Sequence, residues 1–172
     1  MRSEFLVLAL ALVAAAPASS QIMRKGPIAP LPDGRLLLVS GNSRSANFIA
    51  LDESSKNQTD VDLWVFTVMS PPIVLSGATD PKRLIVAQTL AHFSIACATR
   101  RVTKLSEDGF DDVGRWLIAG PGDAPAPIVR DSAQDFMARV MCDGVQPPSA
   151  SPIMGHAAAL AVARRILDHP QV

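Results

Sequence analysis

An export signal followed by a chain with only two cysteines constrains this protein more than any other feature of its sequence. Two charged residues precede the apolar run Phe5–Ala16, and small residues follow it. This order is typical of a secretory signal peptide, so residues 1–20 are predicted to be removed, with Ala18 or Ser20 preceding the cleavage. A run of about a dozen apolar residues is too short to cross a bilayer about 30 Å thick as a helix. No stable membrane anchor is therefore expected after cleavage.

Cys97 and Cys142 lie far inside the mature chain. An exported protein matures in an oxidising compartment, where two thiols at a suitable distance form a disulfide. The pair lacks C-x-x-C spacing, which favours a structural crosslink over a redox site. No cysteine closely follows the signal, so the lipid-modified cysteine of a bacterial lipoprotein is not expected. The sequence predicts a periplasmic or secreted protein with one Cys97–Cys142 disulfide.

Size and charge exclude several classes of function. About 150 residues remain after the signal, which is the size of one domain. The 16 basic and 16 acidic residues balance, so no net field attracts nucleic acid or an anionic membrane. Aromatic residues make up 5% of the chain and tyrosine is absent, which leaves little surface for stacking on bases or sugars. Nucleic acid is not an expected partner.

Short apolar runs separated by turns predict an antiparallel sheet in the first two thirds of the mature chain. Residues 21–34 are rich in proline and glycine and are interpreted as an extended lead-in. Ser70-Pro71-Pro72 is expected to end the third strand, since proline cannot donate to a ladder, and a loop of about ten residues should follow. Within residues 91–97 apolar and polar residues alternate, which places Cys97 on the apolar side. The expected strand segments are Leu36–Val39, Asn47–Leu51, Asp60–Met69, Leu84–Cys97, Arg100–Leu105 and Arg115–Ala119.

The clearest helix begins after Ser132, which is an N-cap residue followed three positions later by a carboxylate. Apolar residues then recur at the spacing of one helix face: Ala133, Phe136, Met137, Val140 and Met141. Cys142 would turn away from this face in a longer helix. The helix is therefore predicted to end at about Met141, before Gly144, so that Cys142 turns back to the sheet.

A second helix is predicted at the C-terminus. Residues 145–152 form a proline-rich linker, and Ser151-Pro152 suits the N-cap and first turn of a helix from Ile153 to about Asp168. Arg164 interrupts its apolar stripe, so weak docking is expected, or use of the helix on another surface. Residues 35–144 are predicted to fold as the domain, with residues 153–172 as a separable helix and tail.

No catalytic or metal site is predicted. His92, His156 and His169 are scattered over different segments, whereas a metal site needs clustered ligands. His92 is expected to face solvent and Trp64 to belong to the core. No serine lies in a Gly-x-Ser-x-Gly turn. Two charge clusters are interpreted as exposed loop charge, with an interaction patch as the alternative: Arg100, Arg101 and Lys104, and Asp108, Asp111 and Asp112.

Four segments carry a resemblance to a known family: Phe48–Ser55, Leu63–Val65, Phe93–Cys97, and Ser132 through Cys142. In order, they are a strand ending in Asp and Ser, an aromatic-bearing strand, a strand ending in the first cysteine, and a capped helix that reaches the second cysteine. This order resembles that of the bacterial surface-adhesin protein E-like family of small exported domains. The resemblance covers about residues 35–143. It implies an α+β domain with a curved antiparallel sheet, a packed helix and the Cys97–Cys142 bridge.

The predicted fold class is α+β, a curved antiparallel β-sheet packed by a helix of the C-terminal half, with one disulfide and an extra C-terminal helix. The expected function is an exported, non-catalytic binding module of the adhesin-like kind, without a cofactor, for a protein or small-molecule ligand. Two alternatives stay open: an envelope-associated structural protein that uses its last helix for association, including self-association, and a hydrolase whose site is assembled from distant residues.

Overall fold

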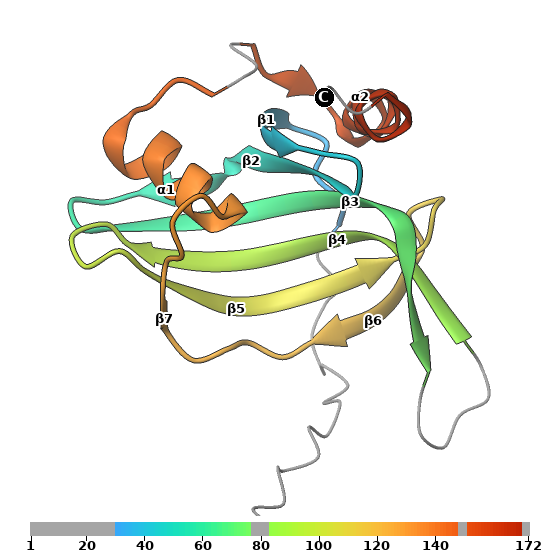
Figure 1. Ribbon diagram of the computed structural model, residues 1–172, viewed down its shortest axis with the longest axis horizontal. Helices are drawn as coiled ribbons and strands as arrows, with labels where there is room; N and C mark the ends of the chain where they lie inside the picture. Colours follow the sequence, from blue (N-terminus) through green and yellow to red (C-terminus); the bar gives the residue numbers. More distant parts are fainter. Residues whose placement is uncertain (1–29, 77–82, 148–150, 170–172) are drawn as a thin grey trace, which may run out of the picture.

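The computed structural model describes residues 30–76, 83–147 and 151–169. The predicted signal peptide and most of the predicted lead-in lie outside these residues. The described chain forms an antiparallel sheet in the order β6-β5-β4-β3-β2-β1-β8, with β7 paired to β5 (Figure 1). The strands are β1 (Arg35–Gly41), β2 (Ser45–Lys56), β3 (Asp60–Ser76), β4 (Arg83–Ala96), β5 (Arg101–Phe110), β6 (Trp116–Gly120), β7 (Ala126–Pro127) and β8 (Ile153–Met154). With the helices α1 (Ala133–Asp143) and α2 (His156–Asp168), this confirms the predicted α+β class.

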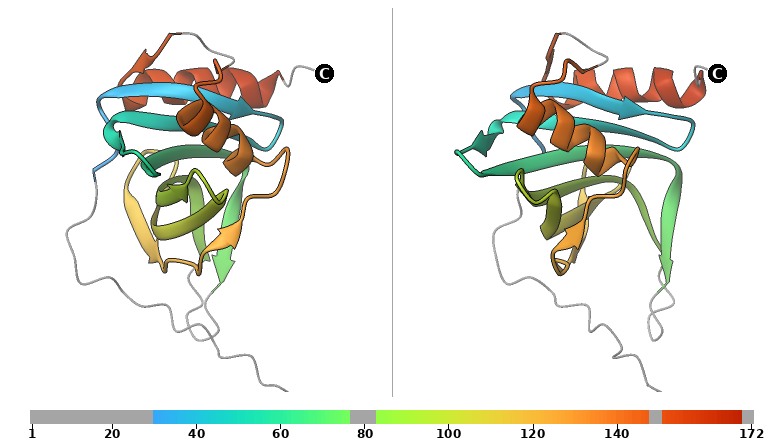
Figure 2. Two further views of the ribbon diagram at one scale, coloured as in Figure 1. Left: turned by 90° about the vertical axis from the view of Figure 1, so that its left-hand side faces the viewer. Right: turned by 60° about the vertical axis from the view of Figure 1, so that its left-hand side comes forward.

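Both faces of the sheet are covered over β1, β2 and β3. Alternate residues of a strand point to opposite faces, and those of β2 and β3 divide accordingly between two apolar clusters. Ile49, Leu63 and Val65 pack with Met137 of α1. Phe48 and Phe66 belong to the other cluster, which includes Ala159 and Ala163 of α2. The two helices therefore lie against opposite faces, and Figure 2 shows them on different sides of β1 and β2.

The third strand is longer than predicted. β3 continues past Met69 to Ser76, and Ile73–Ser76 still pairs with Arg83–Val86 of β4. The two prolines lie at a register shift between Val68 and Ile73, where the β3–β4 ladder is interrupted. Proline is tolerated at such a bulge because no ladder hydrogen bond is required of it. The ends of β3 and β4 consequently bend away from the rest of the sheet, as Figure 1 shows.

The first helix begins where the sequence predicts. The Ser132 hydroxyl accepts a hydrogen bond from the backbone N–H of Asp135 at 3.1 Å, and Gly144 ends the helix with φ 70°. The helix extends to Asp143 rather than stopping at Met141, so the prediction that Cys142 leaves it was wrong. Lys56 of β2 accounts for the two extra residues, because its Nζ donates to the carbonyls of Met141 and Cys142 at 2.8 and 3.1 Å. A cation is favourable at that end of a helix.

The predicted disulfide is confirmed. Cys97 follows the last residue of β4, and its Cα lies 5.6 Å from that of Cys142 in the last turn of α1. Both cysteines pack against the cluster between α1 and the sheet. The bond therefore ties the end of the helix to the end of a central strand, over a sequence separation of 45 residues.

The C-terminal helix begins three residues later than predicted. Ile153 and Met154 are not helical: they pair with Leu36 and Arg35 at the edge of the sheet as β8. Gly155, with φ 79°, turns the chain into α2, and its N–H donates to the carbonyl of Gly34. Ser151 and Pro152 therefore do not cap α2, because the chain first adds a strand.

The second helix is docked on the sheet rather than loosely attached. Ala159 and Ala163 are fully buried against the α2 face of the sheet. The small residue Gly41 permits this close approach, since a Cβ there would lie 2.9 Å from the Cγ2 of Ile166. Weak docking, as expected from the interruption at Arg164, is thus not observed: Arg164 is exposed and the alanines make the contact.

Candidate binding site

A row of four side chains crosses the α2 face of the sheet where α2 no longer covers it. The strand register pairs Ala50 of β2 with Trp64 of β3, Trp64 with His92 of β4, and His92 with Ser106 of β5. Directly paired residues of antiparallel strands have their side chains on the same face and in contact range. Ala50 and Ser106 are buried, whereas Trp64 and His92 are half-buried. This row places the indole ring at an accessible point in the middle of the sheet.

Trp64 and His92 form a stacked aromatic pair. Their ring centroids are 4.5 Å apart and the rings are 4° from parallel. The Nε2 atom of His92 also lies 3.3 Å from Oδ1 of Asp62, a residue two positions before Trp64 on the same face. His92 was expected to face solvent and is instead half-buried against the indole. Trp64 was expected to belong to the core and does pack against the apolar cluster of the α2 face, with part of its surface still exposed. His92 of β4 and Ala50 of β2 are its neighbours on the two adjacent strands.

A pocket of about 460 Å³ is lined by Trp64 and Ala50. Its size is within the range of about 300–1,000 Å³ that small-molecule and side-chain sites occupy. Most of its wall is apolar, and two carboxylates stand at its rim. The lining residues are Pro30, Leu31, Pro32, Asp33, Gly34, Ala50, Glu53, Trp64 and Leu90. Ala50, Trp64 and Leu90 contribute to this lining from the neighbouring strands β2, β3 and β4.

A bulge in β2 brings Glu53 to the pocket. The pairing of β2 with β3 is interrupted between Ala50 and Ser55, and extra residues in one strand re-aim the side chains there. Ser54 holds the bulge: its hydroxyl donates to the carbonyl of Ala50 at 2.6 Å and accepts from the backbone N–H of Trp64 at 3.0 Å. The position of Glu53 is therefore fixed by the same hydrogen bonds that fix the backbone of Trp64.

The rim of the pocket carries negative charge. Asp52 is neutralised by Arg35, whose Nε and backbone N–H each donate to its carboxylate at 2.8 Å. These hydrogen bonds lower the pKa of Asp52. In contrast, neither Asp33 nor Glu53 forms an ion pair or a side-chain hydrogen bond with another described residue. Both side chains are exposed.

Behind the pocket, polar side chains fill the α2 face. The fully buried Gln88 lies 2.7 Å from Nε2 of His156, and the ring of His156 meets Phe66 edge-on at 5.1 Å. Burial lowers the pKa of His156, and the nearby Asp33 opposes this shift. On β5, Asp108 accepts a hydrogen bond from the indole N–H of Trp116 at 3.1 Å.

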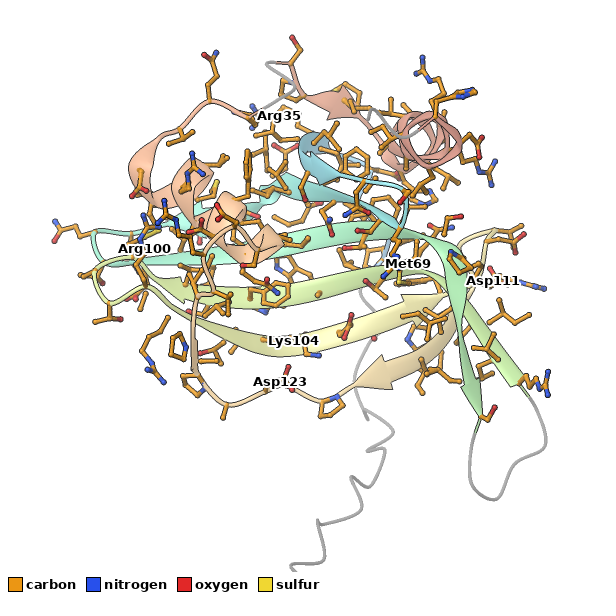
Figure 3. All side chains as sticks on the ribbon, viewed as in Figure 1. Arg35, Met69, Arg100, Lys104, Asp111 and Asp123 are labelled. Carbon is orange, nitrogen blue, oxygen red and sulfur yellow. A yellow bond between two sulfur atoms is a disulfide. The ribbon has the colours of Figure 1, made fainter. Side chains whose placement is uncertain are left out.

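Of the two charge clusters, Arg101 and Asp112 are exposed as predicted, whereas the other members differ from the prediction of exposed loop charge. Asp108 and Asp111 are 2% and 8% exposed, and Asp111 closes the β5–β6 turn by accepting from the backbone N–H groups of Val113 and Arg115. In the basic cluster, Arg100 pairs with Asp143 of α1 and Lys104 pairs with Glu107 and Asp123. Figure 3 shows Lys104 close to Asp123 and away from Arg35. These charges are used within the fold.

The predicted residues do not converge on one site. Cys97 and Cys142 belong to the α1 side of the sheet, whereas the pocket lies on the α2 side. Of the three histidines, His92 and His156 reach the α2 face from different elements, and His169 is exposed after α2. No three His, Cys, Asp or Glu side chains in the described ranges are arranged to hold a metal ion. None of the described helices is long and apolar enough to cross a membrane.

Comparison with known proteins identifies similar structures but no relative by sequence. No family model matches the chain, and no curated protein matches it. Crystal form II of Haemophilus influenzae protein E matches with a TM-score of 0.50 and 16% identity, covering 69% of this chain and 94% of that one. Protein E from non-typeable Haemophilus influenzae matches with a TM-score of 0.47 and 16% identity over 81% of this chain and 94% of that one.

At such low identity the likeness extends to the fold alone. The match to crystal form II covers 94% of protein E and 69% of this chain. The resemblance drawn from the cysteine-bearing strand and the capped helix implied the same kind of fold, from different observations. The chain therefore has the fold of Haemophilus influenzae protein E.

Proposed function

We propose that this protein is an exported, non-catalytic binding module of the surface-adhesin protein E-like family, and that its ligand site is the pocket beside Trp64. The observation that carries this proposal is a partly exposed indole ring in the lining of a largely apolar pocket in the middle of a sheet. Tryptophan is enriched at the centres of binding interfaces, where its large rigid surface is buried on association. The family resemblance supports adhesion as the biological context.

Export is supported by two features. The sequence predicts a signal peptide over residues 1–20, and the disulfide Cys97–Cys142 is of the kind that persists in oxidising compartments. The periplasm or the exterior of a bacterial cell is the proposed location.

A binding role is favoured over a hydrolytic one by the way His92 is used. Its ring lies flat against Trp64, and its Nε2 faces Asp62. This arrangement holds the indole in one orientation, which is what a binding platform requires. Association through α2 is less well supported, because Ala159 and Ala163 on one side of that helix are buried against the chain's own sheet.

The proposal is tested by ligand-observed NMR with the mature protein. Pools of blocked heptapeptides, each enriched in basic, acidic, aromatic or aliphatic residues, are screened by saturation transfer against the wild-type protein and against Trp64→Ala. We expect at least one pool to receive saturation from the wild-type protein and to lose most of it with Trp64→Ala. Trp116→Phe, which alters the other tryptophan of the chain, is the matched control and should retain binding.

Two results would contradict the proposal. Saturation transfer that is the same for the wild-type protein and Trp64→Ala would place the site elsewhere. Peptide cleavage during the incubation, read from the same spectra and lost with His92→Gln, would show a hydrolase instead of a non-catalytic module.

A further inference from the structure

We infer that the pocket beside Trp64 recognises an arginine side chain of a protein partner. This inference rests on the proposed function, because it names the chemistry of the group bound there. It uses three properties of the pocket: a partly exposed indole ring, an apolar wall, and two carboxylates that form no ion pair with a described residue.

The indole face favours a cation. A guanidinium or ammonium group over an aromatic ring is attracted by the negative charge of the ring face, and tryptophan is the best of the aromatic side chains for this contact. The stacked His92 blocks one face of Trp64. Trp64 is nevertheless only half-buried and lines the pocket, so part of its ring is within reach of a ligand. A planar guanidinium can lie parallel to the indole there, as arginine does on aromatic surfaces.

The apolar wall suits the stem of an arginine. Three methylene groups precede the guanidinium, and such stems are buried along apolar surface while the charged head reaches polar groups. Pro30, Leu31, Pro32 and Leu90 supply that surface. A bare cation would find no ligands along this wall, so the pocket favours a charge carried on an aliphatic chain.

The two carboxylates provide charge complementarity from two different segments of the lining. Asp33 belongs to the segment before β1, and Glu53 belongs to the bulge in β2. Arginine donates from several N–H groups in a fixed plane and can therefore bond two carboxylates, whereas a lysine ammonium is a point charge.

The charges around the pocket are consistent with this choice. Arg35 is the described cation nearest to Asp33 along the chain. Its Nε and backbone N–H are already hydrogen-bonded to the Asp52 carboxylate, each at 2.8 Å. Asp62 faces His92, and His156 faces Gln88. The pocket therefore presents excess negative charge to a ligand, although the whole chain has equal numbers of basic and acidic residues.

Four blocked peptides test the inference, acetyl-Gly-Ser-Gly-X-Gly-Ser-Gly-amide with arginine, citrulline, norleucine or glutamate at X. Citrulline keeps the shape and hydrogen bonding of arginine without its charge. Binding is measured by tryptophan fluorescence in Trp116→Phe, where Trp64 is the remaining tryptophan, and by saturation transfer with the wild-type protein. We expect the arginine peptide to bind about tenfold more tightly than the citrulline peptide. Raising the salt concentration from about 0.05 to about 0.5 M should remove most of that difference.

Variants of the protein separate the contribution of the two carboxylates to peptide binding from the contribution of the apolar pocket. Asp33→Asn with Glu53→Gln should reduce the preference for arginine over citrulline to less than about twofold. The matched control, Asp112→Asn with Asp131→Asn, removes two carboxylates elsewhere and should keep the full preference. Ala50→Val fills the pocket and should weaken all four peptides.

The outcomes distinguish this inference from the proposed function. If arginine and citrulline peptides bind equally and both are lost with Trp64→Ala, the pocket binds ligands but does not select a cation, and the inference is overturned alone. Tighter binding of the norleucine or glutamate peptide would overturn it in the same way. If neither these peptides nor the heptapeptide pools bind at Trp64, both proposals fail.

Discussion

The Nε2 atom of His156 lies 2.7 Å from the side-chain oxygen of Gln88. Both hydrogens of the Gln88 amide are used elsewhere, since its nitrogen donates to the carbonyls of Asp111 and Asp112 at 3.0 and 3.1 Å. Its oxygen is therefore the acceptor, and the Nε2 of His156 carries the hydrogen. Through this buried amide the first turn of α2 is joined to β4 and to the β5–β6 turn.

Replacing Gln88 should be costly although it is one polar residue. Gln88→Leu would remove the shared partner of the Asp111 and Asp112 carbonyls and of the His156 imidazole N–H. A polar group left unsatisfied in the interior costs about 1–3 kcal/mol. We expect the free energy of unfolding in urea to fall by about 2 kcal/mol or more. Gln58→Leu, at an exposed position in the β2–β3 turn, should change it by less than about 0.5 kcal/mol.

His156 should make stability depend on pH. Burial lowers its pKa in the folded state, and Asp33 opposes this only in part. The unfolded chain, with a histidine pKa near its ordinary 6.5, therefore takes up the proton first as the pH falls. The stabilisation by neutral His156 is present above about pH 6.5 and is lost as the pH falls through the folded-state pKa.

Urea unfolding at about pH 7.5 and about pH 5.5 measures this effect. The wild-type protein should lose more stability over that interval than His156→Gln, in which the neutral amide cannot titrate. His169→Gln changes an exposed histidine and should behave as the wild type. Equal losses in His156→Gln and the wild type would show that other groups cause the pH dependence.

Local sequence rules account for α1 well. Ser132 and Gly144 bound the helix through contacts with residues three to five positions away, and such contacts can be recognised in a sequence. The alternation that points Cys97 toward α1 is local as well. The disulfide follows from these two placements, so this part of the fold was predictable.

The missed features depend on contacts between distant segments. Ile153–Met154 is too short to show a strand pattern and pairs only because β1 offers a free edge. Asp108 and Asp111 look like loop charges until Trp116 and Arg115 supply their hydrogen bonds. The pocket depends on the register that aligns Ala50, Trp64 and His92 across three strands. A register shift of one residue would place these side chains on the other face.

The cap and core of α1 can be tested separately. Ser132→Ala removes the acceptor for the Asp135 N–H and should cost about 1 kcal/mol, whereas Ser132→Asp keeps an acceptor and should cost little. Met137 is 4% exposed in the cluster beneath the helix, so Met137→Ala should cost about 3 kcal/mol through lost burial and a cavity. Phe136 lies on the same stripe but is only half-buried. Denaturant unfolding in which Ser132→Asp is as destabilised as Ser132→Ala would exclude the capping role.

The disulfide should stabilise the fold through its long loop. A crosslink that closes 45 residues lowers the entropy of the unfolded chain, worth about 4 kcal/mol on the chain-entropy account. Replacing both cysteines with alanine should lower the free energy of unfolding by about 2–4 kcal/mol. Protein prepared by export should show no thiol that reacts with Ellman's reagent in denaturant, and two reactive thiols there would contradict the bond.

From the sequence, the residues after Gly144 were expected to be dispensable for folding. The docking of α2 on the sheet leads to the opposite expectation. Ala163 is fully buried against the sheet, whereas Ala161 on the same helix is exposed. Ala163→Leu should overpack this contact and cost about 1–3 kcal/mol, while Ala161→Leu should change stability by less than about 0.5 kcal/mol. Deleting residues 145–172 removes β8 and uncovers Phe48 and Phe66. We expect the truncated chain to lose its cooperative unfolding transition. A truncated protein that still forms the disulfide and unfolds cooperatively would show that residues 35–144 are an independent domain, and that α2 covers a core already able to form without it.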